Sequence, residues 1–212
     1  EKITWEELPV IPNAQGLSGA FAGVSNGAII VAGGSNFPQT PEGKAGSRFW
    51  YADIYVLSDA EQEGWQTGFS LKEPLAYGAS VISSQSLILI GGSNAAGNHK
   101  QVTQITWEAA SRKINQVSLP PLPHALSFVG AAEMDEIVYV AGIQTVGERS
   151  EFINIFWSLN LNNLEAGWES LKPWEGPVRN RAVVVGQNTG YRKNLYIIGG
   201  EAQIEDEKGE IQ

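Results

Sequence analysis

The side chains best suited to binding an acidic ligand in this chain are two widely separated arginines. Arg48 lies in the segment Ala45-Gly46-Ser47-Arg48-Phe49, and Arg179 stands two positions before Arg181. A guanidinium group pairs with a carboxylate through two parallel hydrogen bonds, so Arg48 and Arg179 are candidates for holding an acid group. Each could equally be a solvated or structural charge. The other candidate substrate-binding side chains are Asn36, Asn94 and Glu201.

Several kinds of chemistry are excluded by residues that the sequence lacks. Cysteine is absent, which rules out disulfides, thiolate catalysis and cysteine-ligated metals. The two histidines, His99 and His124, do not have the spacing of metal ligands. The chain contains no G-x-S-x-G nucleophile motif and no glycine-rich phosphate loop. We therefore expect neither a metal nor a cofactor.

The charge balance bears on the partners that the protein can take. Lysine and arginine total 14 against 23 aspartates and glutamates, which gives a net charge of -9. A chain this acidic has no electrostatic reason to bind nucleic acid or an anionic membrane surface. An apolar run long enough to span a membrane is also absent. An anionic small ligand would need a local basic pocket.

A repeated stretch indicates the elements that must position these side chains. Four times a short aliphatic run ends in a glycine pair or its near equivalent, at intervals of about 50 to 60 residues. The copies end at Gly33-Gly34, Gly91-Gly92, Ala141-Gly142 and Gly199-Gly200, with Ala141 taken as the equivalent of the first glycine. This pattern is typical of kelch-type β-propeller blades and predicts an all-β fold.

Each repeat divides into four predicted strands, a to d. The first copy comprises 17–24, 28–33, 51–57 and 65–71, and the second 77–83, 86–91, 102–108 and 113–119. The third comprises 127–132, 136–142, 153–160 and 168–171, and a half copy follows at 181–186 and 194–199. Strand d begins with a tryptophan that is expected to pack between blades, and it ends near a proline.

The same signature predicts an isolated d strand at the beginning of the chain, because residues 1–5 read as a strand and Trp5 is followed by Pro9. Residues 1–212 then form a single propeller domain of about three and a half blades. A closed ring needs whole blades, and residues 201–212 are poorly patterned for a strand. We therefore expect the remaining blades to come from the same or a companion chain.

Blade topology brings the long b–c loops and the d–a connections to one face, where binding sites usually lie on such scaffolds. The predicted b–c loops are 35–50, 93–101 and 143–152. Of Arg179 and Arg181, one is expected to face the channel and the other to pack. The polar residues predicted on this face are Asn36, Lys44, Arg48, Asn94, His99, Lys100, His124, Arg149, Arg179 and Glu201.

Two segments carry a family resemblance. The run Gly-Leu-Ser-Gly-Ala-Phe-Ala-Gly-Val-Ser-Asn at 16–26 and the Gly46-Ser47-Arg48 loop resemble blades of the bacterial N-acetylneuraminate (sialic acid) mutarotases, also called epimerases. The segment Ala76-Tyr77-Gly78-Ala79-Ser80 is similar as well. The blades stand in a circularly permuted order, as in one known branch of that family.

The resemblance implies a six-bladed propeller that interconverts the two anomers of a small-molecule sugar acid, free sialic acid, by acid/base ring opening in the periplasm. It implies that Arg48 is the family's loop arginine and that Arg179 matches an arginine at the start of another blade. Leu75 replaces an arginine of other members. The catalytic residues are not assigned, because the family's glutamate is expected beyond Gln212 and Glu201 matches a different blade.

A noncatalytic kelch module that binds a protein or glycan is the alternative, since a fold does not fix a function. Copper radical chemistry of the galactose-oxidase type would need a Cys–Tyr crosslink and is excluded. An enzyme should have a deep polar pocket that holds Arg48 and Arg179, whereas a binding module should present a broad apolar or aromatic patch.

Overall fold

The protein is described by a computed structural model that covers residues 3–5, 7–38, 46–58, 64–146 and 151–202. Lys44, Arg149 and residues 203–212 from the sequence predictions lie outside this part of the chain. The described residues form β-strands and one short 3-10 turn, η1 (Leu164–Ala166). Within these residues, no helix is long and apolar enough to cross a membrane.

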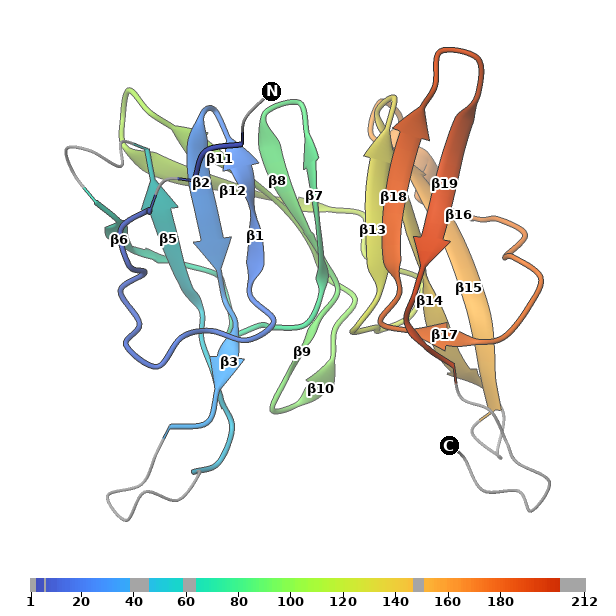
Figure 1. Ribbon diagram of the computed structural model, residues 1–212, viewed down its shortest axis with the longest axis horizontal. Coiled ribbons are helices and arrows are strands. Elements are labelled where there is room, and N and C mark those ends of the chain that lie inside the picture. The colour runs from blue at the N-terminus through green and yellow to red at the C-terminus, as the bar shows by residue number, and fades with distance from the viewer. Residues whose placement is uncertain (1–2, 6, 39–45, 59–63, 147–150, 203–212) are drawn as a thin grey trace.

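Three antiparallel sheets of four strands follow one another along the chain and form the blades (Figure 1). Blade 1 contains β1 (Phe21–Ser25), β2 (Ala28–Ala32), β5 (Asp53–Leu57) and β6 (Gln66–Ser70). Blade 2 contains β7 (Ala79–Ser83), β8 (Ser86–Ile90), β11 (Val102–Glu108) and β12 (Lys113–Leu119). Blade 3 contains β13 (Gly130–Met134), β14 (Ile137–Val146), β15 (Glu151–Asn160) and β16 (Trp168–Ser170).

A half blade and three short ladders complete the fold. The half blade is the hairpin of β18 (Val183–Asn188) and β19 (Lys193–Ile198). The ladders join β3 (Ser35–Asn36) to β4 (Phe49–Trp50), β9 (Ser93–Asn94) to β10 (Gly97–Asn98), and β17 (Arg179–Asn180) to β20 (Glu201–Ala202). All three lie at the same end of the blades, here called the loop face (Figure 1).

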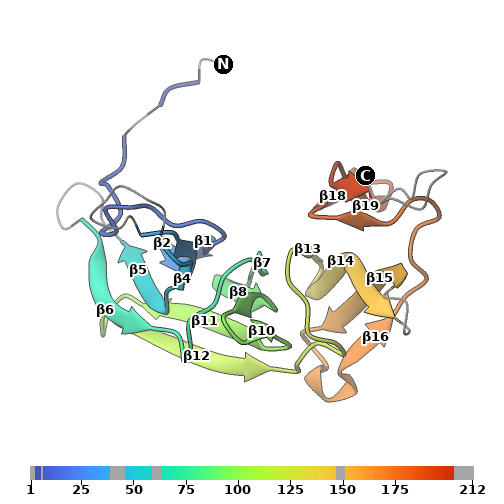
Figure 2. The same cartoon turned by 90° about the horizontal axis from the view of Figure 1, so that it is seen from below.

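The blades stand side by side in an open arc (Figure 2). Strands β1, β7, β13 and β18 line its concave side, and β6, β12 and β16 lie on its convex side (Figure 2). The hydrophobic core is divided among the spaces between neighbouring blades. Phe21 and Ile30 of blade 1, for example, share one cluster with Ile105 and Trp107 of blade 2. Neighbouring blades therefore stabilise one another by burying a shared apolar surface.

The tryptophan at the start of strand d joins adjacent blades in blade 3, as predicted, whereas in blade 1 it joins the blade to the segment that precedes it in the chain. The indole N–H of Trp65 in blade 1 donates to the carbonyl oxygen of Pro9 (2.7 Å). Trp168 in blade 3 donates in the same way to Pro120, which follows the last strand of blade 2 (2.9 Å). Ile114 replaces this tryptophan in blade 2 and packs against the core between blades 1 and 2.

Within the blades, the ends of the predicted strands agree with the observed ones to within two residues, except that β14 extends further and that each strand a begins at least two residues later than expected. The cause is a residue in the left-handed conformation just before the strand, which interrupts an extended backbone. Gly19, Tyr77, Phe128 and Arg181 occupy this position, with φ between 56° and 64°.

The predicted strand at the beginning of the chain is wrong for the residues that the structure describes. Residues 3–5 and 7–9 are irregular, and Trp5 is 91% exposed. A strand forms only when a neighbouring strand satisfies its backbone groups, and this segment leads away from the sheets (Figure 2). Conversely, Glu201 and Ala202, predicted to lie outside any strand, form the short strand β20.

The third repeat also differs from the prediction. The strand register pairs Phe21 with Ala32, Ala79 with Ile90 and Gly130 with Ala141, so Gly142, not Ala141, matches Gly33 and Gly91. At the next position blades 1 and 2 have glycines with φ of 102° and 110°, where blade 3 has Ile143. A β-branched residue does not adopt that conformation, so β14 continues straight and pairs with β15 as far as Val146. The expected loop at 143–152 is therefore largely a hairpin.

Candidate functional site

One residue position recurs in each blade along the inner edge of the arc, and the residues at this position form the centre of the candidate site. The N–H of Tyr77 donates to the carbonyl of Gly19 (2.8 Å), that of Phe128 to Tyr77 (2.7 Å), and that of Arg181 to Phe128 (3.2 Å). These four residues, here called the inner column, come from successive blades. The hydrogen bonds link the blades at the loop-face end of their inner strands.

The side chains of the inner column lie one over the next. The rings of Tyr77 and Phe128 have centroids 4.8 Å apart, and the guanidinium carbon of Arg181 lies 4.5 Å from the Phe128 centroid. A methyl group on Gly19 would lie 2.4 Å from the Tyr77 ring, so the ring covers the glycine. The column therefore places aromatic and cationic side chains at the mouth of the concave channel.

Arg48 stands beside this column because of its loop. Gly46 donates to Pro38 (2.8 Å) and the β3–β4 ladder closes the base of the loop, so Arg48 leads directly into β4. Its guanidinium carbon lies 4.7 Å from the centroid of Phe37, 5.2 Å from Tyr77 and 5.8 Å from Trp50. These are cation–π distances.

The rings of Phe37, Trp50 and Tyr77 surround the guanidinium group of Arg48. Within the part of the chain that the structure describes, its N–H groups have no hydrogen-bond acceptor and no acidic partner. They are therefore available to an oxygen ligand such as a carboxylate.

The phenol of Tyr77 belongs to a small hydroxyl cluster. It lies 2.8 Å from the Oγ of Ser35, which is fully buried, and 3.4 Å from the Oγ of Ser18. Backbone hydrogen bonds in both directions between the two serines hold their hydroxyls together. Burial raises the pKa of Tyr77, but these hydrogen bonds and the charges of Arg48 and Arg181 outweigh it and lower the pKa below its ordinary value.

A pocket of about 460 Å³ opens beside Arg48, between blades 1 and 2. Its walls come from the β3–β4 extension on one side and from the β9–β10 hairpin on the other. The described residues that line it are Arg48, Phe49, Trp50, Pro74, Asn94, Ala95 and Ala96. Its volume suits a monosaccharide, since small-molecule sites are concave and mostly apolar with a few placed polar groups. Arg179 does not line this pocket.

Asn36 and Asn94 occupy equivalent positions after the glycine pairs, and both make structural hydrogen bonds. Asn36 Nδ2 donates to the carbonyl of Gly16, and Asn94 Nδ2 donates to the carbonyl of Pro74, each at 3.0 Å. Asn36 Oδ1 also accepts from the Tyr51 hydroxyl (3.0 Å). These amides attach the turn after strand b to the connection that leads into strand a. A substrate contact by either amide stays a prediction.

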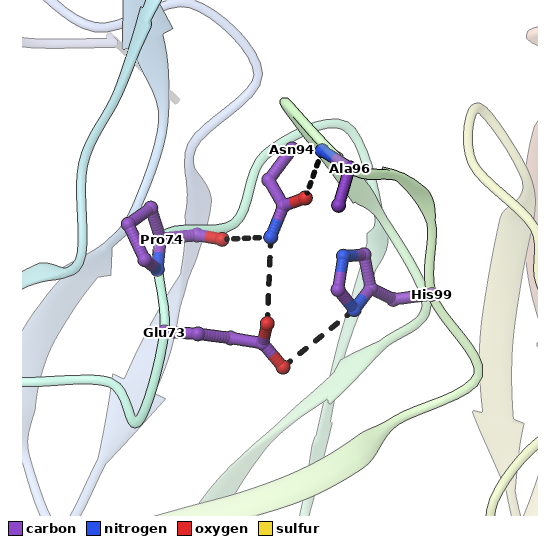
Figure 3. Close-up of polar contacts among 5 residues, drawn as sticks. All are labelled: Glu73, Pro74, Asn94, Ala96 and His99. Atoms are coloured by element: carbon purple, nitrogen blue, oxygen red, sulfur yellow. Dashed lines mark hydrogen bonds and ion pairs between the residues drawn. The ribbon is translucent and has the colours of Figure 1, made fainter.

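The carboxylate of Glu73 contacts both His99 and Asn94 (Figure 3), and Asn94 also lines the Arg48 pocket. Glu73 Oε1 is 3.6 Å from His99 Nδ1, and Glu73 Oε2 lies 3.4 Å from Asn94 Nδ2. Asn94 Oδ1 in turn accepts from the backbone N–H of Ala96 (2.8 Å). These contacts therefore hold the β9–β10 hairpin against the chain segment that precedes blade 2.

Arg179 and Glu201 meet at the β17–β20 ladder. Arg179 Nη1 donates to the carbonyl of Gly199 (2.8 Å), so its guanidinium supports the turn at the Gly199-Gly200 pair. Glu201 forms an exposed ion pair with Arg181 (2.8 Å). Of the two arginines at this start of a blade, Arg181 enters the inner column and Arg179 packs against the turn. Arg48 and Arg181 therefore flank the Tyr77–Phe128 pair.

The remaining predicted residues lie on the loop face. Lys100 Nζ donates to the carbonyl of Pro123 (2.8 Å). His124 lines a separate pocket of about 370 Å³ between blades 2 and 3, together with Phe128 and Asn180. In the described ranges, no three histidine, aspartate or glutamate side chains lie close enough together to hold a metal ion.

Sequence reasoning missed Tyr77, Phe128 and Arg181 as members of one site. Tyr77 and Phe128 each stand 14 positions before the glycine that ends strand b (91−77 and 142−128), as Gly19 does before Gly33 (33−19), whereas Arg181 stands 18 positions before Gly199 (199−181). For Tyr77 and Phe128 the signal was therefore present in the repeat register, although not in any residue type or motif.

The arc of four-stranded antiparallel blades around a lined channel defines a β-propeller protein. A solved structure described as "Structure of YjhT" is similar in fold, with a TM-score of 0.65 at 15% sequence identity. The superposition covers 94% of this chain and 70% of that one.

Sequence comparison identifies the family. A family model described as N-acetylneuraminate epimerase matches residues 1–114, and the chain belongs to this family. The N-acetylneuraminate epimerase of Salmonella enteritidis PT4 (strain P125109) is 36% identical over 121 residues, which cover 50% of this chain and 30% of the relative. That of Yersinia enterocolitica (strain NCTC 13174 / 8081) is 35% identical over 123 residues, covering 50% and 31%. The chain thus matches less than a third of the length of these relatives.

Proposed function

We propose that this chain is the part of an N-acetylneuraminate mutarotase that carries one wall of the active site. The observation that supports this most directly is the coincidence of two findings on the same residues. The segment 1–114, which matches the epimerase family, contains Arg48, its aromatic surroundings and the pocket beside it. The substrate would be a sugar acid, whose carboxylate suits the guanidinium group of Arg48.

The reaction interconverts the α and β anomers of the free sugar through the open keto acid. An acid protonates the ring oxygen while the bond from that oxygen to the anomeric carbon breaks, and a base takes the proton of the anomeric hydroxyl. Reclosure on the opposite face of the new carbonyl gives the other anomer. Both proton transfers reverse on closure, so no group is consumed and no cofactor is required.

Arg48 has the role of holding the sugar carboxylate. Its two outer nitrogens can pair with both carboxylate oxygens, while Phe37, Trp50 and Tyr77 restrict the orientation of the group. This fixes the anomeric carbon next to the carboxylate and therefore near the channel mouth. Positioning of this kind lowers the activation barrier because the entropy cost of orienting the reacting groups is met when the substrate binds.

A noncatalytic binding module remains the second candidate, and one observation favours it. Phe37 and Phe49, which lie around Arg48, are 49% and 55% exposed. Exposed aromatic rings near a cation are suited to holding a glycan or a peptide as well as a free sugar. The pocket thus combines the polar feature expected of the enzyme with the aromatic surface expected of the module.

Proton NMR of freshly dissolved β-sialic acid separates the two functions. The signal of the α anomer is followed over time with the native protein that contains this chain and, separately, with buffer alone. Faster approach to the anomeric equilibrium supports the mutarotase. An unchanged rate together with saturable glycan binding by the folded protein would instead establish the binding module.

We also propose that the protein acts in the periplasm in sialic acid metabolism, as the family resemblance implies. Fractionation of the cells that produce it would place it there by co-purification with a periplasmic marker. Recovery with the cytoplasmic fraction would contradict this proposal.

A further inference from the structure

We infer that Tyr77 is the group that protonates the ring oxygen of the sugar at the mouth of the channel. This inference rests on the proposed mutarotase function and adds to it a proton donor from within the described chain. It follows from four properties of Tyr77: its backbone conformation, the support of its ring, its hydroxyl partners and its distance from the carboxylate-binding arginine.

The backbone of Tyr77 is held in a conformation that favours glycine, with a φ of 62°. Other non-glycine residues with positive φ, such as Asn26 and Asp135, lie in hairpin turns, where this conformation is usual. Tyr77 instead lies in front of an inner strand, at the inner-column position where Phe128 and Arg181 share this conformation. Left-handed residues outside turns are often found at functional sites, where the fold maintains the strain to aim a side chain. Here the conformation sends the phenol ring across Gly19 toward Arg48.

The ring is supported on both sides, so its hydroxyl is fixed in position. Gly19 lies under it and Phe128 stacks against it at 4.8 Å. Gly19 is the one member of the inner column without a side chain, which leaves room for the ring. A proton donor must be positioned to be efficient, and this packing supplies the positioning without a ligand.

The hydroxyl group of Tyr77 has hydrogen-bond partners that suit it to donate a proton. Ser35 is fully buried and its Oγ lies 2.8 Å from the phenol oxygen, so it can donate to that oxygen and stabilise the phenolate. The phenol proton then points to Ser18 or to a ligand that replaces it, because Ser18 is exposed and its contact is longer, at 3.4 Å. Arg48 and Arg181 favour the same charge state, and the lowered pKa of Tyr77 agrees with this arrangement.

The bond between the anomeric carbon and the ring oxygen breaks, its electron pair goes to the ring oxygen, and that oxygen takes the phenol proton of Tyr77. The anomeric hydroxyl loses its proton to water or to a carboxylate base as the carbonyl forms. Closure on the other face of the carbonyl returns both protons. Arg48 holds the carboxylate next to the anomeric carbon throughout, and its guanidinium carbon lies 5.2 Å from the centroid of the Tyr77 ring, so the sugar is bound beside this ring.

The test replaces the phenol while leaving the ring stack intact. Tyr77→Phe is compared with wild type and with Tyr139→Phe, whose ring stacks on Phe156 in blade 3, away from the site. Anomerisation by the native full-length protein is measured by NMR, after the uncatalysed rate is subtracted. We expect kcat to fall about 100-fold or more in Tyr77→Phe with only a small change in KM, since a general acid contributes factors of this size. Tyr139→Phe should retain the wild-type rate.

A pH profile separates proton donation from a structural role. Because the donor must be protonated, the wild-type rate should fall on the alkaline side, below the pH at which an ordinary tyrosine ionises. Ser35→Ala should move this limb to higher pH, and fluorotyrosine placed at position 77 should move it to lower pH. If Tyr77 had only a structural role, neither Ser35→Ala nor fluorotyrosine would move the alkaline limb. These two variants also test the inference if Tyr77→Phe does not fold.

The outcomes distinguish this inference from the proposed function. If the wild-type protein does not accelerate anomerisation, the mutarotase proposal and this inference both fail. If wild type is active and Tyr77→Phe keeps its kcat, only the inference about Tyr77 is overturned. If kcat falls but the alkaline limb stays in place in Ser35→Ala and with fluorotyrosine, Tyr77 has a structural role and the inference is also overturned.

Discussion

The indole nitrogen of Trp65 and the carbonyl oxygen of Pro9 are 2.7 Å apart although 56 positions separate them in the sequence. The same bond recurs between Trp168 and Pro120, at 2.9 Å. Trp65 joins the last strand of blade 1 to the segment that precedes the same blade, and Trp168 joins the last strand of blade 3 to the segment that follows blade 2. These bonds therefore act on the outer side of the arc, while the inner column joins the blades at its axis.

Replacing Trp65 with phenylalanine should weaken this connection. The substitution removes the N–H donor and part of the packing surface, so we expect a loss of about 1 to 2 kcal/mol of stability. Urea unfolding of the native protein would measure it. Trp5→Phe serves as the control, because Trp5 is 91% exposed and should change stability very little. Equal effects of the two substitutions would contradict a special role of the Trp65 bond.

The strands were predictable from sequence because each blade repeats a local pattern. Alternation, tight turns and glycine pairs identify β2 and β8 without any information from elsewhere in the chain. One failure occurred where a distant partner decides the structure, and another where a single residue departs from the repeat. Residues 3–5 carry a strand-like pattern but do not pair, and Ile143 changes a turn into a continued hairpin because it stands where the other blades have glycine.

The glycine pairs themselves give a second prediction. Gly33 has a φ of 63°, and a methyl group added to it would lie 2.1 Å from the carbonyl oxygen of Leu75 in the next segment. We expect Gly33→Ala to destabilise the protein by more than about 3 kcal/mol, because strain and a backbone clash act together.

Gly27→Ala isolates the strain component. Gly27 has a φ of 79° in the β1–β2 hairpin, but no atom lies within 4 Å of an added methyl group. Its substitution should cost only about 1 to 2 kcal/mol. Thermal or urea unfolding of the two variants gives the difference, and a Gly33→Ala protein as stable as Gly27→Ala would show that the blades can separate at this contact.

Asn36 gives a third prediction, which separates a structural from a binding role. Its amide N–H donates to the Gly16 carbonyl, so Asn36→Asp would place a negative oxygen against that carbonyl within a buried site. We expect a loss of about 1 to 3 kcal/mol. At Asn188 only the side-chain oxygen is used, accepting from the backbone N–H of Gly190, so Asn188→Asp should be nearly neutral. Unchanged stability of Asn36→Asp would contradict the structural role.

The candidate site was only partly predictable. Arg48 was found from its residue type and its loop, since charge and an exposed loop are properties of the local sequence. Tyr77 was not, because an aromatic residue before a strand is normally packed. For Arg179 and Arg181 the sequence predicted only that one of them would face the channel, without deciding which. What makes Tyr77 and Arg181 neighbours is the blade-to-blade hydrogen bonding of the inner column, which brings together residues far apart in the chain.

Arg48 and Arg179 were equal candidates in the sequence, and their environments now predict different outcomes. Arg48 is held by aromatic faces with its N–H groups available, whereas Arg179 donates to the carbonyl of Gly199. If the native protein is the proposed mutarotase, Arg48→Ala should raise KM for sialic acid by about 10- to 100-fold, the size of a lost charge-assisted hydrogen-bond pair. Arg48→Lys should recover part of this loss, because an ammonium group keeps the charge but cannot pair through two parallel bonds.

Arg179→Ala should act mainly on stability. Its guanidinium supports the Gly199-Gly200 turn, so its removal should lower the unfolding midpoint while KM changes by less than a few fold. Steady-state NMR kinetics and urea unfolding on the same preparations provide both measurements. If Arg179→Ala raised KM as much as Arg48→Ala, both arginines would contact the substrate, and the separation of roles derived from their hydrogen bonds would be wrong. If neither raised KM, the carboxylate would have to bind elsewhere on the loop face, with Arg181 as the next cation to replace.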